Sequence, residues 1–322
     1  MSQIAVEPQL RTKPAVGRVS RPGAVSLPDL VGNTPLVRLN HITSHLPPAV
    51  EVYAKAEWFN PSGSVKDRPA LNIIRSAIAS GQLTTDKVLL DSTSGNMGIA
   101  YATLAAALGY RVRLVMPENV SPERVNILRA LGAEFSLSSP LEGSDGAIRE
   151  AQALAAAQPE VFYYANQYNN PANWQAHFNT TGPEIIAQTD LGVTHFVAGL
   201  GTSGTFVGAG RALRAFNPNI RLIAFQPDGA FHGLEGLKHM DTAIVPKIYD
   251  RELADENLAL ATEEAHVMTR RLAREEGLFV GISAGAAAAA ALRVAETLTS
   301  GVVVTLFPDA GYKYVSDRFW KE

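Results

Sequence analysis

Residues 279–285 read FVGISAG, in which Gly281, Ser283 and Gly285 match the G-x-S-x-G turn that carries the nucleophile in serine hydrolases. An α/β-hydrolase also needs an acid and then a histidine after that serine in the chain. All seven histidines precede Ser283. A nucleophilic role for Ser283 is therefore disfavoured. The alternative is a tight strand-to-helix turn whose glycines let the chain point a hydroxyl into a cleft.

A second stretch, GLGTSGT at 199–205, matches the G-x-G-x-x-G pattern of dinucleotide-binding turns, with Asp228 as the acid expected downstream. The loop also carries three hydroxyls, on Thr202, Ser203 and Thr205. Hydroxyls and backbone N–H groups at a helix N-terminus suit one compact phosphate dianion. A glycine-rich turn without any ligand is the third interpretation.

Lys66 lies in NPSGSVKDRPA, at 60–70, where Asn60 to Gly63 have turn chemistry and Pro69 fits only near the start of a helix. Lys66 is thus expected in a turn or in the first helical turn. The helix dipole disfavours a cation there unless the charge is used or removed, as it is in a Schiff base. A solvated surface lysine is the ordinary alternative.

The stretch DSTSGNMG, at 91–98, ends a predicted strand with clustered hydroxyls and an amide before a predicted helix. Such groups at a helix N-terminus can hold a carboxylate. Ordinary N-capping needs only one of them, so the cluster exceeds what capping requires.

The composition is that of a globular enzyme, with 322 residues, a formal charge of −3 and no cysteine. A chain of this length predicts two lobes around a cleft. The charge favours neither nucleic acid nor membrane as a partner, and the lack of thiols fits a cytoplasmic protein without disulfides or a thiolate zinc site; no metal is expected. Residues 1–28 are expected to form an N-terminal extension.

Short apolar runs alternate with helix-length segments along the chain. Strands are expected in the following ranges: 51–57, 87–92, 111–117, 194–201, 220–227, 278–283 and 301–309. Between 111–117 and the next strand, Ser121 is the expected N-cap and Pro122 the first residue of a helix. The alternation predicts open, mainly parallel α/β sheets with ligands at the carboxyl ends of the strands. The stretch 140–170 is expected to be irregular and to cross between the lobes.

Taken together, the motifs resemble the cysteine synthase and cystathionine β-synthase family, whose members are fold-type II enzymes that use pyridoxal 5′-phosphate (PLP). LVGNTPLVRL, NPSGSVKDR, TSGN, GLGTSGT, GISAG and FPDAGYKY follow in that family's order over nearly the whole chain. The resemblance implies two α/β domains, similar to the tryptophan synthase β fold, with the active site between them. It places a smaller, mobile lobe at about 65–170 and a larger PLP-binding lobe at about 29–64 plus 171–322, within one enzyme unit spanning 30–310.

By position, the resemblance makes Lys66 the catalytic residue and the PLP-bearing lysine. It gives the phosphate loop as Gly201, Thr202, Ser203, Gly204 and Thr205. It assigns the substrate carboxylate to Thr93, Ser94, Gly95, Asn96 and Gln167. Asn96 would also bind the 3′-oxygen of PLP, and Ser283 would face its pyridine nitrogen. A neutral serine there favours expulsion of a β-leaving group over a long-lived carbanion.

The reaction implied is β-replacement on an activated L-serine, through an aldimine on Lys66 and an α-aminoacrylate, with sulfide giving L-cysteine. O-acetyl-L-serine is the preferred substrate, because Asp228 occupies the place where a basic residue is expected to read phosphate in the O-phosphoserine-using type. Met97 replaces the threonine usual after TSGN and removes one hydroxyl. The alternatives are O-phosphoserine sulfhydrylase, cystathionine β-synthase, 2,3-diaminopropionate synthase, a nucleotide-dependent oxidoreductase and a non-enzymatic paralogue. A homodimer is implied, with serine acetyltransferase or a sulfur-carrier protein as a further partner.

Overall fold

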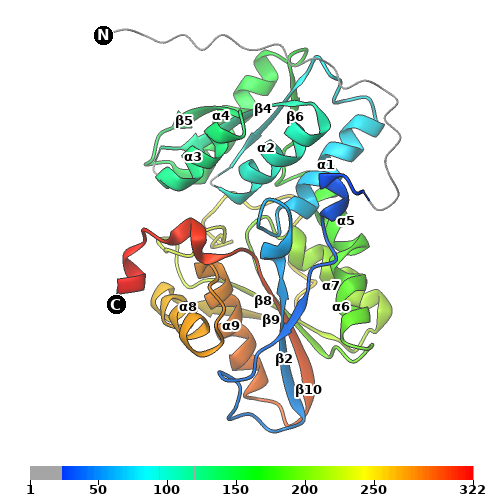
Figure 1. Cartoon of the computed structure of the whole chain (residues 1–322), viewed down its shortest axis with the longest axis vertical. Coiled ribbons are helices and arrows are strands. Elements are labelled where there is room, and N and C mark those ends of the chain that lie inside the picture. The colour runs from blue at the N-terminus through cyan, green and yellow to red at the C-terminus, as the bar shows by residue number, and fades with distance from the viewer. Residues whose placement is uncertain (1–23, 94, 119, 322) are drawn as a thin grey trace.

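The computed structural model describes residues 24–93, 95–118 and 120–321, which form two α/β units, each built on its own sheet (Figure 1). Residues 1–23 lie outside the described part of the chain, so the expectation of an N-terminal extension concerns residues that are almost all undescribed.

The smaller sheet is entirely parallel and has the strand order β5-β4-β3-β6. Its strands are β3 (Val88–Ser92), β4 (Arg111–Pro117), β5 (Glu134–Ser138) and β6 (Phe162–Tyr164). β3 is buried along its whole length, as expected for a central parallel strand covered on both faces. The helices of this unit are α2 (Asn96–Leu108), α3 (Pro122–Ala130) and α4 (Gly143–Ala157). The apolar side chains of α1 (Asp67–Ala79) pack into the same core.

The larger sheet has the order β1-β2-β10-β7-β8-β9, in which only β1 runs antiparallel to its neighbour. Its strands are β1 (Leu36–Arg38), β2 (Val50–Ala56), β7 (His195–Gly199), β8 (Arg221–Pro227), β9 (Glu256–Leu260) and β10 (Gly301–Phe307). The last strand, β10, lies between the early strand β2 and β7, so strands that are far apart in the chain pair directly in this sheet.

Helices cover both faces of the larger sheet (Figure 1). On one side lie α5 (Pro171–Asn179), α6 (Thr181–Gln188) and α7 (Gly204–Phe216), and on the other α8 (Thr262–Glu275) and α9 (Ile282–Ala295). The alanine run of α9 is buried throughout, because small side chains let this helix approach the sheet and α8 closely. Four 3₁₀ turns complete the described elements: η1 (Leu27–Leu30), η2 (Glu57–Phe59), η3 (Gly311–Tyr314) and η4 (Arg318–Lys321).

Most of the strands expected from the sequence are confirmed, within two residues at each end. Pro122 is the first residue of α3 and Ser121 its N-cap, as predicted. The expected strand at 278–283 is wrong: Val280 forms only an isolated bridge with Ala310, and α9 begins at Ile282.

The expectation of an irregular segment at 140–170 is also wrong, because α4 and β6 occupy most of it. The buried residues of α4 include Ala147, Ile148 and Ala151, which have helical spacing. The glycines and acidic residues at the start of α4 obscured the helical spacing of its apolar residues in the sequence. The lobe boundaries near 65 and 170 stay a prediction.

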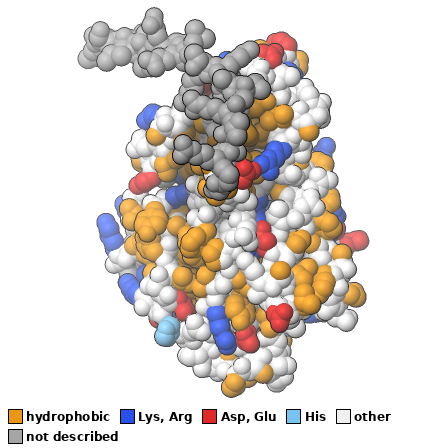
Figure 2. All heavy atoms as spheres, turned by 45° about the vertical axis from the view of Figure 1, so that its right-hand side comes forward, with side chains coloured by type: hydrophobic (Ala, Val, Ile, Leu, Met, Phe, Trp, Pro, Cys, Tyr) orange, Lys and Arg blue, Asp and Glu red, His pale blue; other side chains and the backbone are white. Residues whose placement is uncertain are grey.

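The face shown in Figure 2 mixes basic, acidic and apolar side chains without one large field of a single sign. That distribution agrees with the nearly balanced count of 28 basic and 31 acidic residues. In the described part of the chain, no helix combines the length and the hydropathy needed to cross a membrane.

Candidate active site

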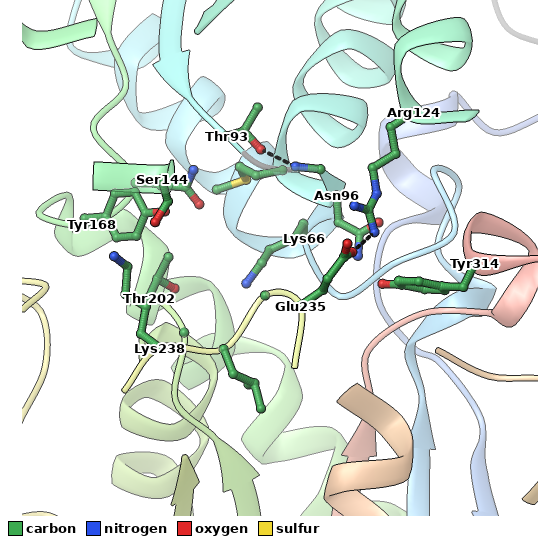
Figure 3. A pocket seen from close by; sticks show the side chains of 16 residues that line it. Lys66, Thr93, Asn96, Arg124, Ser144, Tyr168, Thr202, Glu235, Lys238 and Tyr314 are labelled. Atoms are coloured by element: carbon green, nitrogen blue, oxygen red, sulfur yellow. Dashed lines mark hydrogen bonds and ion pairs between the residues drawn. The ribbon is translucent and has the colours of Figure 1, made fainter. Parts of the chain in front are cut away.

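Lys66 is the N-cap of α1, in agreement with the sequence prediction, and its side chain points into a cavity between the two sheets (Figure 3). The turn before it is held by Asp67, whose carboxylate accepts the backbone N–H of Ser62 at 2.7 Å. Arg68 is buried and forms ion pairs at 2.7 Å with both Glu57 and Glu184. These contacts fix the first turn of α1 and therefore the base of the Lys66 side chain.

Burial lowers the pKa of Lys66 from its usual range to about 8, against the opposing effect of the Asp309 carboxylate, which favours the charged ammonium. The cost of removing the ammonium from water is the larger of the two effects. At pH 7 roughly a tenth of the amine is thus uncharged, far more than in an ordinary lysine, and able to act as a nucleophile or base. A solvated surface lysine is excluded by this placement.

The loop 201–205 joins β7 to α7 and lines a second cavity that adjoins the first at Lys66. Ser203 is the N-cap of α7 and has a φ of 66°, so its backbone is in the left-handed region. Its hydroxyl is buried and has no hydrogen-bond partner among the described residues. An unpaired donor at a helix N-terminus is the expected setting for an anion.

The phosphate loop is also too crowded for larger residues at its glycines. A β-carbon on Gly204 would lie 2.0 Å from Oδ1 of Asn173, and one on Gly201 would lie 2.1 Å from the carbonyl oxygen of Gly236. The hydroxyl of Thr205 contacts Nε2 of the buried His177 at 3.3 Å. The unpaired hydroxyl of Ser203, the position at the N-terminus of α7 and the close backbone approach fit a phosphate monoester, with Lys66 beside it.

The segment before α2 forms the wall opposite the phosphate loop (Figure 3). Thr93, Gly95, Asn96 and Met97 line the cavity. Oγ1 of Thr93 accepts the backbone N–H groups of Gly95 and Gly98, each at 3.1 Å, so part of this cluster does serve as a cap of α2. Ser94, predicted as a substrate ligand, lies outside the described residues.

Gln167 and Ser283 complete the set expected from the sequence. Gln167 lines the same cavity as Lys66, and its Nε2 donates to the backbone oxygen of Ser92 at 2.7 Å. Ser283 is buried in the first turn of α9 and lines the cavity of the phosphate loop. The described site residues therefore lie together around Lys66. A serine-hydrolase site would not require a lysine at its centre.

Two ion pairs between the units were not anticipated from the sequence. Arg124 of α3 pairs with Glu235 (Figure 3). Lys238 pairs with Asp145 of α4 at 2.9 Å. Glu235 and Lys238 belong to the long connection between β8 and β9, and both line the Lys66 cavity together with Arg124. No motif marks these residues, because their proximity arises only when the two sheets come together.

Asp228 does not line either cavity. It follows β8, its side chain is exposed, and its backbone N–H donates to the oxygen of Leu260 at 3.1 Å. The sequence argument that its charge repels a phosphate in the site is therefore wrong. Met97, in contrast, is buried against the cavity and gives that wall an apolar side chain where a hydroxyl is usual in the family.

A lysine that lies between the 201–205 loop and the turn before α2, where two mainly parallel sheets meet, fits a PLP enzyme of fold type II. The chain belongs to the family of pyridoxal-phosphate dependent enzymes, whose family model matches residues 27–309. This assignment replaces the dinucleotide-binding and serine-hydrolase alternatives.

Within that family the chain is an enzyme of the cysteine synthase type. It is 49% identical over 298 residues to the cysteine synthase of Aquifex aeolicus, covering 91% of each chain. Its structure superposes with a TM-score of 0.88 on cysteine synthase from Entamoeba histolytica, at 34% identity, covering 96% of this chain and 95% of that one. It also superposes with a TM-score of 0.87 on the O-acetylserine dependent cystathionine β-synthase from Helicobacter pylori, at 35% identity, covering 92% and 99% respectively.

Proposed function

We propose that this enzyme makes L-cysteine from O-acetyl-L-serine and sulfide. The observation that carries the proposal is the position of the Lys66 amine, in a cavity bounded by the phosphate loop on one side and the Thr93–Met97 turn on the other. The O-acetylserine dependence in the name of the Helicobacter pylori relative supports the same substrate.

When bound, PLP supplies an electron sink for the bond electrons of the substrate Cα. Lys66 would hold it covalently, Gly201 to Thr205 would hold its phosphate, and Ser283 would face its ring nitrogen. The hydroxyl of Thr93, the amide of Gln167 and the backbone N–H groups near Gly95 bind the substrate carboxylate. These groups are neutral donors, so the carboxylate keeps its charge and its orientation.

Once the substrate amine has replaced the Lys66 amine on the cofactor, Lys66 would be free to act as the base that moves the Cα proton. Its pKa of about 8 makes the neutral amine available near physiological pH, because burial disfavours the ammonium. Lys66 takes the proton from Cα, and acetate leaves Cβ with the electrons of the C–O bond. Hydrosulfide then adds at Cβ, and Lys66 returns the proton to Cα. Closure of the proposed lobe at about 65–170 excludes water meanwhile.

O-phospho-L-serine is a second candidate substrate, favoured by a specific observation. Arg124 and Lys238 both line the cavity and bring two cations to the region beyond Lys66, although each is paired with an acid. An anionic leaving group can compete with Glu235 and Asp145 for these cations. Asp228 is exposed and lines neither cavity, so its charge does not repel a phosphate there.

The location, the oligomeric state and the partner proteins of the enzyme follow from the same resemblance. We infer a cytoplasmic homodimer, supported by the absence of cysteine and by the family resemblance. Serine acetyltransferase is the partner that fits O-acetylserine, and a sulfur-carrier protein is the partner that fits O-phosphoserine.

The decisive experiment measures L-cysteine formation from sulfide with O-acetylserine, O-phosphoserine or serine as the second substrate. The highest kcat/KM is expected with O-acetylserine. Lys66→Ala is the matched control and should abolish turnover while PLP stays bound through its phosphate. Cysteine formation by Lys66→Ala at the wild-type rate refutes the mechanism, and reaction with O-phosphoserine alone refutes the substrate.

A further inference from the structure

Both the nitrogen and the oxygen of the Asn96 side-chain amide form hydrogen bonds. Its Nδ2 donates to Oδ2 of Asp309 at 2.7 Å, and its Oδ1 accepts from Nζ of Lys313 at 2.7 Å. An ionised carboxylate only accepts hydrogen bonds and an ammonium only donates them. The two partners therefore permit a single orientation of the amide.

The partners come from the unit opposite to Asn96. Asn96 begins α2 beside the smaller sheet, whereas Asp309 follows β10 of the larger sheet and Lys313 lies in η3. Lys313 also donates to the backbone oxygen of Gly63 at 3.3 Å, in the turn that precedes Lys66. The contact thus ties the Asn96 turn to the Lys66 turn as well as to the larger sheet.

Burying the carboxylate of Asp309 costs free energy, because a charged group is removed from water. Asp309 is fully buried, and although Oδ2 also accepts the hydroxyl of Tyr314 at 2.9 Å, Oδ1 has no hydrogen-bond partner among the described residues. Burial raises the pKa of Asp309, against the lowering effect of Lys313, Asn96, Tyr314 and Arg124. A buried carboxylate oxygen left unpaired in a native protein calls for an explanation beyond stability.

The amide nitrogen of Asn96 carries two hydrogens, and Asp309 engages one of them. Among the described residues, no acceptor other than Asp309 is found for this nitrogen, and Asn96 lines both adjoining cavities next to Lys66, where a bound ligand can accept the second N–H. We propose that Asp309 and Lys313 clamp the Asn96 amide with its nitrogen toward the 3′-oxygen of PLP, which makes Asp309 a positioning residue. The inference rests on the proposed function, because it concerns the cofactor ring beside Lys66.

The clamp has an electronic consequence. A donor at the 3′-oxygen stabilises that oxygen as an anion, whereas a flipped amide would present its own oxygen and destabilise it. Bound PLP should therefore favour the tautomer that absorbs in the visible over the one that absorbs in the near ultraviolet.

The test uses the holoenzyme with Asp309→Asn, which keeps the shape but can donate as well as accept, so that the polarity of the clamp is lost. The ratio of the visible to the near-ultraviolet band is expected to fall, and the PLP dissociation constant of the apoenzyme to rise about tenfold. Asp317→Asn is the matched control, because it removes the same charge from the same C-terminal segment, where no hydrogen bond to Asn96 is found. It should leave the band ratio unchanged.

A double-mutant cycle with Asn96→Ala separates this role from a merely structural one. In the Asn96→Ala background, Asp309→Asn should change the PLP dissociation constant less than about threefold. Strict additivity of the two substitutions overturns the proposal, and so does an equal spectral change in Asp317→Asn. If Asp309→Asn does not fold, Lys313→Met replaces it and should give a smaller shift of the same sign; no shift overturns the proposal. Because the readout is the cofactor spectrum, a wrong substrate assignment leaves this result unaffected.

Discussion

The backbone of Gly201 packs against Gly236 so closely that a β-carbon on Gly201 would lie 2.1 Å from the carbonyl oxygen of Gly236. The contact joins the phosphate loop to the connection that carries Glu235 and Lys238. The phosphate loop and the two ion pairs between the units are therefore parts of one packed assembly.

Gly201→Ala should weaken PLP binding at least about tenfold, because the added methyl group forces a backbone shift worth roughly 1–3 kcal/mol. Equilibrium dialysis with PLP measures the effect, and circular dichroism checks the fold. Gly229→Ala is the matched control, since its β-carbon meets no atom within 4 Å. Equal affinity in the two variants would contradict the role of this contact.

The reactivity of Lys66 in the apoenzyme should depend on pH in a way that ordinary lysines do not. The neutral amine is the reactive form, and burial lowers the pKa of Lys66 to about 8. Acetylation of Lys66 by acetic anhydride should therefore reach half of its maximal rate at about pH 8 and level off roughly one pH unit higher. A model lysine peptide added to the same sample, with a pKa of about 10.4, should keep gaining reactivity. Peptide mass spectrometry distinguishes them, and a parallel rise of both would refute the assignment.

Ser283→Ala should keep PLP bound and reduce kcat less than about tenfold, because a serine facing the ring nitrogen tunes the cofactor without forming a bond to substrate. A nucleophilic serine would instead lose about 10⁶-fold in kcat. Ser283→Asp should change which species accumulate, since a carboxylate keeps the ring nitrogen protonated. Stopped-flow absorbance follows those species, and an unchanged spectrum in Ser283→Asp would argue against this position for Ser283.

Lys238→Met tests the cation beyond Lys66. If the Lys238 ammonium faces the leaving group, its loss should lower kcat/KM with O-phosphoserine at least about tenfold, because the phosphate is charged. The value with O-acetylserine, whose leaving group is neutral in the substrate, should change less than about threefold. Where O-phosphoserine is not turned over, its inhibition constant replaces kcat/KM. Lys247→Met, on the same connection and exposed, is the control. An equal loss for both substrates would assign Lys238 to stability.

The sequence allowed the motif-bearing turns to be predicted because their function depends on local chemistry. Lys66, the 201–205 loop and Ser283 each lie at a helix start, where the local residue types decide the backbone conformation. Val280 misled the prediction, because an apolar run of strand length is not distinguished from the entry to a buried helix.

The residues that close the site could not be predicted in the same way. The partners of Arg124, Lys238 and Asn96 are more than 90 positions away in the chain, and only the packing of the two units brings them together. Asp228 illustrates the opposite error. It follows a strand end, as expected, but its side chain is exposed and lines neither cavity.

The order of the strands also bears on how the protein is made. The smaller sheet is contiguous along the chain, so it can form while the ribosome is still adding the C-terminal third. The larger sheet cannot, because Val50 of β2 pairs with Gly301 of β10. Until β10 emerges, the edge of β2 that pairs with β10 stays unpaired, which leaves the newly synthesised chain open to mispairing late in translation.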